Sequence, residues 1–176
     1  MLIGISVRRW QENSRDFEKS VAAACDYISQ KYGYYPVFVP MQKEKDTAIS
    51  KNIMRMMKVK SSIIDKDLSV EEMMSIFKCM DMCIGMRLHS LIYSAAQSVP
   101  LIGLSYDPKI VSFMEYTHQN FCIDVRDINK EKLIKMIDEC MENYDEIRED
   151  LKNHCEYLKE HAHKNGELAA QLYEKQ

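Results

Sequence analysis

An arginine and a histidine stand at the start of a predicted helix, a place where cations are disfavoured. Arg87 and His89 follow the turn residue Gly85 in the run GMRLHS. A helix N-terminus carries partial positive charge and unpaired N–H groups, so it favours a nearby anion. Two cations there oppose that field unless a negative ligand sits between them. The pattern predicts half of an anion site, with Gly85 and Ser90 as further contacts.

The elements that must position this turn lie between Asp81 and Asp107. A short apolar run over 82–84 predicts a strand that stops at Gly85. Apolar residues then recur at the spacing of one helix face until Pro100, and 101–104 predict a second buried strand. The helix face consists of Leu88, Leu91, Ile92, Ala95, Ala96 and Val99. Together they predict one parallel βαβ unit.

Two other turns carry residues of the same chemistry. Arg8 and Arg9 follow an apolar strand predicted over 2–7. The strand over 101–104 is followed by a further candidate set: Ser105, Tyr106, Asp107 and Lys109. Guanidinium forks match carboxylate and phosphate geometry, and a lysine supplies a point charge for phosphate. An imidazole exchanges protons near neutral pH, so His89 is the natural proton donor of the group.

Six predicted strands alternate with helices along the chain, which predicts an α/β fold with a doubly wound, Rossmann-like parallel sheet. The helices are expected over 14–32 with a cap at Asn13 or Ser14, from Asp46 or Thr47 to about 57, and over 69–80, 88–99, 108–117 and 129–144. A charged helix is expected over 145–176, broken near Gly166. In the strand order 3-2-1-4-5-6 the three cationic turns meet at one edge of the sheet. No G-x-G-x-x-G follows the first strand, so the usual dinucleotide fingerprint is absent.

Composition narrows the class of protein. The 176 residues carry a formal net charge of −3, so no basic excess indicates nucleic-acid binding. No apolar run is long enough to span a membrane, and the N-terminus has the reverse order of a signal peptide. Six scattered cysteines predict buried, reduced thiols rather than a metal site. We expect a cytoplasmic chain that forms a single domain over 1–176.

The quoted motifs resemble the polysaccharide pyruvyl transferase family of the bacterial cell-wall type. The resemblance rests on the segment GMRLHSLIYSAAQSVPLIGLSYDPKI, extends upstream through SVEEMMSIFKCMDMCIG and reaches the first strand, IGISVRRW. Family members resemble glycosyltransferases with two facing Rossmann-like halves, the GT-B architecture. The chain is similar to the C-terminal half alone, which implies a missing N-terminal half.

The resemblance implies transfer of a pyruvyl group from phosphoenolpyruvate to a sugar, with formation of a cyclic ketal and release of phosphate. It implies His89 as the catalytic residue and Arg8, Arg87 and Lys109 as donor contacts, while Arg9 stands where many relatives have proline. Phosphoenolpyruvate is then the donor substrate, no cofactor or metal is expected, and the acceptor is a lipid-linked or nucleotide-linked sugar. An isolated half is expected to turn over little.

Two other functions remain open: the nucleotide-sugar half of a GT-B glycosyltransferase, and a non-catalytic anion-binding module. Structural roles are open for single residues too. Arg87 could pair with Asp81 or Asp107, and Lys109 could be a solvated surface residue. Asp107 before Pro108 suits a helix cap.

Overall fold

The computed structural model of the protein describes residues 1–10 and 15–174. The elements follow one another as β1 Leu2–Ser6, α1 Arg15–Tyr32, β2 Tyr35–Phe38, α2 Lys43–Met56, β3 Ser62–Ile63, α3 Val70–Lys78, β4 Met82–Gly85, α4 Leu88–Ala96, β5 Leu101–Ser105, α5 Pro108–Tyr116, β6 Cys122–Asp124, α6 Lys130–Glu142 and α7 Tyr144–Glu174. The helix cap expected at Asn13 or Ser14 lies outside the described residues.

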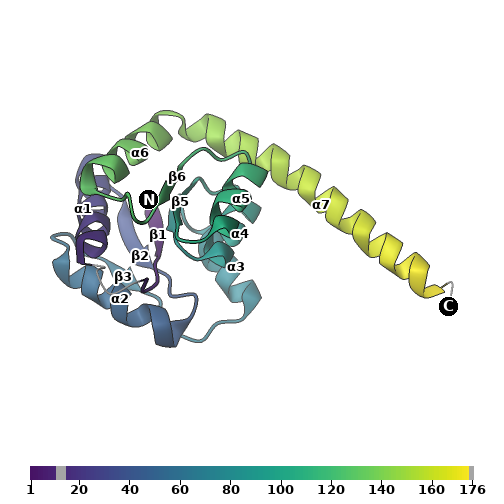
Figure 1. Ribbon diagram of the computed structural model, residues 1–176, viewed down its shortest axis with the longest axis horizontal. Coiled ribbons are helices and arrows are strands. Elements are labelled where there is room, and N and C mark those ends of the chain that lie inside the picture. The colour runs from purple at the N-terminus through teal and green to yellow at the C-terminus, as the bar shows by residue number, and fades with distance from the viewer. Residues whose placement is uncertain (11–14, 175–176) are drawn as a thin grey trace.

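All strand pairs are parallel, and the order is β3-β2-β1-β4-β5-β6. Helices α1, α2 and α6 lie on one side of the sheet, and α3, α4 and α5 on the other (Figure 1). This arrangement follows from right-handed crossovers: α1 and α2 connect strands in the direction from β1 to β3, whereas α3, α4 and α5 connect strands in the opposite direction, from β3 to β6, and so lie on the other face. The prediction of a doubly wound, Rossmann-like α/β fold is confirmed.

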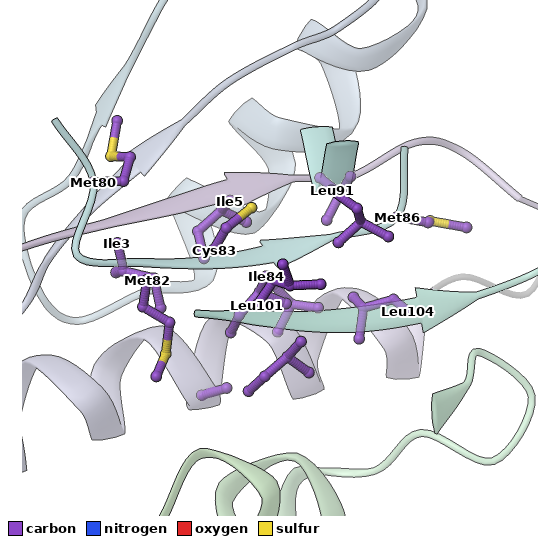
Figure 2. Packing of buried hydrophobic residues seen from close by; sticks show 14 of the residues in the cluster. Ile3, Ile5, Met80, Met82, Cys83, Ile84, Met86, Leu91, Leu101 and Leu104 are labelled. Atoms are coloured by element: carbon purple, nitrogen blue, oxygen red, sulfur yellow. The ribbon is translucent and has the colours of Figure 1, made fainter. Parts of the chain in front are cut away.

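The hydrophobic core is built around the strands of the sheet. Ile3, Ile5, Met82, Ile84 and Leu101 are fully buried. Figure 2 shows Met82 and Cys83 projecting to opposite sides of β4, so this strand packs against both helical layers. A strand buried on both faces needs a continuous apolar run, which is the pattern that the sequence carries.

Two helices differ from their expected boundaries. Helix α2 begins at Lys43, so Asp46 lies in its first turn and is not its cap. Helix α7 runs without interruption past Gly166 and projects away from the domain in Figure 1. The predicted break is wrong because glycine costs a helix only about 1 kcal/mol, which does not forbid helical backbone.

Candidate anion-binding site

The site is built on the carboxyl ends of three neighbouring strands. Ser6 of β1 is in register with Gly85 of β4, and Gly85 is in register with Gly103 of β5. Arg8, Arg87 and Ser105 each follow these positions by two residues. The strand order therefore brings the three predicted turns to one edge of the sheet, at the place where ligands bind in open α/β folds.

Arg8 is joined to the turn after β5 by its side chain. Its Nη1 donates a hydrogen bond of 2.9 Å to the hydroxyl of Tyr106, and its guanidinium carbon lies 4.7 Å from the centre of that ring. The Nη1 bond and the ring contact leave Nε buried, with no hydrogen-bond partner among the described residues. A buried N–H of a cation without a partner is costly, so Arg8 is suited to an anionic acceptor.

Lys109 lies on the same tyrosine. Its Nζ is 5.8 Å from the centre of the Tyr106 ring and 3.4 Å from a carboxylate oxygen of Asp107. About half of the lysine side chain is exposed. Arg8, Tyr106, Asp107 and Lys109 thus form one connected group from two turns, as the strand order predicts.

Asp107 caps helix α5. Its carboxylate accepts a hydrogen bond of 3.0 Å from the backbone N–H of Lys109, with Pro108 at the first helical position. This backbone hydrogen bond lowers the pKa of Asp107, and the nearby charges of Lys109 and Arg8 lower that pKa further. The hydroxyl of Ser105 is buried and donates to the Asp107 carbonyl at 3.3 Å. Ser105 therefore supports the turn from below.

Arg87 has a partner that the sequence did not indicate. Its Nε and Nη2 donate to the two carboxylate oxygens of Asp46 at 3.0 and 2.5 Å. The two partners left open by the sequence have other roles: Asp81 accepts the backbone N–H of Leu2, and Asp107 caps α5. Asp46 was missed because a single acidic residue in the first turn of a helix is ordinary in sequence.

This ion pair supplies a negative charge near the start of α4. Arg87 is the N-cap residue of α4, where its charge opposes the dipole, and Asp46 supplies the balancing negative charge from within the protein. The arginine alone therefore does not require an external anion. The case for one rests instead on Arg8, on His89 and on the N-terminus of α4, which no side chain caps.

Gly85 and Ser90 lie beneath the first turn of α4. A Cβ at Gly85 would stand 2.6 Å from Leu91 Cδ2 and 2.7 Å from Ser90 Oγ, so only glycine lets the helix start this close to the strand. The Ser90 side chain is fully buried, and its hydroxyl donates to the Arg87 carbonyl at 2.6 Å. In this structure the Ser90 hydroxyl is directed to the backbone, and both residues hold the turn in place; their contact with a ligand stays a prediction.

His89 is exposed in the first turn of α4. Its ring centre lies 6.1 Å from that of Tyr93, one turn later, and its imidazole forms no hydrogen bond within the described part of the chain. Arg9 is also exposed. Both side chains are therefore accessible from solvent.

Within residues 1–10 and 15–174 the structure contains neither a metal-site candidate nor a membrane-spanning helix. No cluster of three or more histidine, cysteine or acidic side chains could hold a metal ion there. No helix in those ranges is long and apolar enough to cross a membrane. A cavity of about 650 Å³ lies at the opposite end of α4, against α7, and is lined by none of the candidate residues.

Solved structures share this fold. The C-terminal domain of a group 1 glycosyl transferase, LpcC from Francisella tularensis, matches at 10% identity with a TM-score of 0.60, over 90% of this chain and 84% of that one. UDP-GlcNAc 2-epimerase from Neisseria meningitidis, bound to UDP-GlcNAc, matches at 14% identity with a TM-score of 0.61, over 93% of this chain and 44% of that one. S. aureus MnaA, solved with UDP, matches at 10% identity with a TM-score of 0.64, over 85% of this chain and 39% of that one.

These likenesses show the fold, and this chain spans less than half the length of the two UDP-bound proteins. No curated protein matches the sequence. The family model for polysaccharide pyruvyl transferases matches residues 3–108, a range that holds β1, the Arg87–His89 turn and Tyr106. The chain belongs to the polysaccharide pyruvyl transferase family.

Proposed function

We propose that this chain is the donor-binding half of a pyruvyltransferase that uses phosphoenolpyruvate to form a ketal on a sugar of a cell-wall or capsular polysaccharide. Family membership supports a transferase that acts on polysaccharides. The observation that carries the donor assignment is Arg8, whose buried Nε has no partner among the described residues beside the uncapped N-terminus of α4. Phosphoenolpyruvate offers two anionic groups, a carboxylate and a phosphate, to such an edge.

Different cationic groups bind the two anionic groups of the donor. In the proposal, Arg8 and the free N–H groups of Arg87 bind the carboxylate and phosphate as guanidinium forks, and Lys109 adds charge on the phosphate. Backbone N–H groups at the start of α4 supply further donors, as helix N-termini do for phosphates. Tyr106 holds Arg8 at 2.9 Å and so fixes the direction of its fork.

His89 is the proposed general acid. Protonation of the vinyl CH2 carbon converts it to the ketal methyl group and makes the adjacent carbon electrophilic. Two hydroxyl groups of the acceptor add to that carbon, and the C–O bond to phosphate breaks. The acceptor releases two hydroxyl protons. One replaces the proton that the general acid gave to the methyl group, and the other leaves with phosphate. His89 is exposed in the first turn of α4, and an imidazole can donate the proton that forms the methyl group.

The proposal includes no cofactor or metal, and phosphoenolpyruvate as the donor substrate carries both the pyruvyl group and the phosphate leaving group. We assign the acceptor, a lipid-linked or nucleotide-linked sugar, mainly to a facing N-terminal half, because this chain spans 39–44% of two structural neighbours. The free thiols of Cys25, Cys83 and Cys140 support a reducing, cytoplasmic location.

Thermal denaturation tests the donor site with the chain as it stands. Inorganic phosphate and phosphoenolpyruvate are expected to raise Tm, because a ligand that binds only the folded state stabilises it. His89→Ala and Arg8→Ala should remove most of the shift. Arg55→Ala, an exposed arginine near the end of α2, is the control and should keep it.

The alternative of a nucleotide-sugar site has some support, since two fold neighbours were solved with UDP or UDP-GlcNAc. UDP is therefore included in the same assay. A shift with UDP and none with phosphoenolpyruvate would refute the pyruvyl assignment in favour of the nucleotide-sugar one. Equal shifts in wild type and in His89→Ala would refute the placement of the site.

A further inference from the structure

Asp46 is a buried carboxylate at the candidate site. Its side chain is fully buried, and the side chain of its partner Arg87 is only 11% exposed. One oxygen accepts the backbone N–H of Gln42 at 2.9 Å and Arg87 Nε at 3.0 Å, while the other accepts Arg87 Nη2. The carboxylate is therefore held at its own end by the first turn of α2.

The pair also crosses the end of the strand that carries Arg8. Asp46 follows β2 and Arg87 follows β4, and β1 lies between those two strands. The ion pair thus links the turns on both sides of β1. Its position fixes the Arg87 guanidinium next to the backbone that leads to Arg8.

Only part of the Arg87 guanidinium is used. A guanidinium has five N–H groups in one plane. Two of them bond to Asp46, and the remaining three have no partner in the part of the chain that the structure describes. A rigid plane fixed along one edge leaves its other N–H groups pointing in a set direction.

From this geometry we propose that Asp46 is a positioning residue for the donor anion, acting through Arg87. The inference rests on the proposed function, since the anion is the one assigned there. Asp46 aligns the free N–H groups of Arg87 with the carboxylate or phosphate of the donor, so less ordering is required on binding. It does so although its own charge repels that anion.

The opposing signs of these two effects make the proposal testable. If Asp46 acted through charge alone, Asp46→Asn would tighten anion binding, because a negative charge near the site is removed. Positioning predicts the reverse, a Kd for phosphoenolpyruvate weaker by roughly tenfold, the scale of a hydrogen bond to a charged group. Glu44→Gln is the matched control: it removes the same charge from the exposed face of the same helix turn.

The measurement is isothermal titration of the whole chain with phosphoenolpyruvate and with inorganic phosphate, well below the Tm of each variant. Asp46→Asn, Arg87→Gln and the double variant form a thermodynamic cycle. We expect Asp46→Asn to weaken binding in the wild-type background and to have no further effect beside Arg87→Gln. A purely structural role would lower Tm and leave Kd unchanged, and that result would overturn the proposal.

Arg87→Lys keeps the proposal testable if Asp46→Asn does not fold. It retains a cation opposite Asp46 but loses the fork, so positioning predicts a similar loss, and unchanged binding refutes it. Failure of the proposed function looks different. Wild type would then bind phosphate without phosphoenolpyruvate, which leaves the cycle measurable on phosphate, or would bind neither, which overturns both.

Discussion

The hydrogen bond from Arg8 Nη1 to the hydroxyl of Tyr106 passes across the end of β4, a strand that neither residue belongs to or follows. Arg8 follows β1 and Tyr106 follows β5, and β4 lies between them in the sheet. The bond therefore passes the start of α4, where Arg87 and His89 lie. In the opposite direction, the Arg87–Asp46 pair passes the end of β1. The two bonds interlock the turns that carry the candidate residues.

Tyr106→Phe tests the first of these bonds. The ring and its contact with the guanidinium remain, but Arg8 loses its acceptor and must be ordered by the ligand. Ordering one long side chain costs about 0.5–1.5 kcal/mol, which corresponds to a roughly 2- to 13-fold weaker Kd for phosphoenolpyruvate. Calorimetric titration measures it. Tyr173→Phe, on an exposed tyrosine of α7, is the control, and equal Kd values in all three proteins would contradict the role.

Asp107→Ala tests the helix cap and its pH dependence. The folded-state pKa of Asp107 lies below the usual value because the carboxylate accepts the Lys109 N–H. Its stabilising contribution is therefore complete above the unfolded pKa of about 3.9 and disappears as pH falls through the lower folded value. Wild type should have the higher Tm at pH 7, and the difference should shrink below pH 4. A difference that stays constant down to pH 2.5 would show that the charged cap is not responsible.

The doubly wound sheet and the meeting of three turns at one of its edges could be predicted from the sequence for a clear physical reason. Apolar runs that end in Gly85 or beside Arg8 define strands buried on both faces, and parallel strands place all their C-terminal turns at one edge. Sheet topology then brings Arg8 near Tyr106 without any knowledge of side-chain geometry. The cap at Asp107 could also be predicted, because aspartate directly before proline is a local sequence signal for a helix start.

The partners of the side chains could not be predicted in the same way. Asp46 and Arg87 are 41 positions apart, and the contact depends on how far α2 reaches over the end of β1. Nor does sequence tell whether Ser90 faces outward or inward, since both fit the first turn of a helix. The structure shows it turned inward to the Arg87 carbonyl.

Helix α7 offers a prediction about stability. Its buried contacts end near Cys155, whose thiol donates to the Ala95 carbonyl at 2.9 Å, and beyond it Leu168, Leu172 and Tyr173 are exposed. Deleting residues 164–176 should therefore change Tm of this chain very little. Leu151→Ala, on a fully buried residue of the same helix, should cost about 2–5 kcal/mol in the free energy of unfolding. Urea denaturation measures both, and a large loss on deletion would place folding contacts in the projecting part.

Gly85→Ala tests the close approach of α4 to β4 on which the whole turn depends. The added methyl group would lie 2.6 Å from Leu91 Cδ2 and 2.7 Å from Ser90 Oγ, so the first turn of α4 must move outward. Overpacking of this kind costs about 1–3 kcal/mol, and the displaced turn carries Arg87 and His89 with it. We expect a lower free energy of unfolding and a smaller Tm shift with phosphate. Gly166→Ala is the matched control: this helical glycine has no atom within 4 Å of the added Cβ, so alanine should stabilise the chain by about 0.5–1 kcal/mol. If Gly85→Ala matched wild type in both stability and phosphate binding, α4 could start elsewhere without loss, and its N-terminus would not be the fixed part of the site.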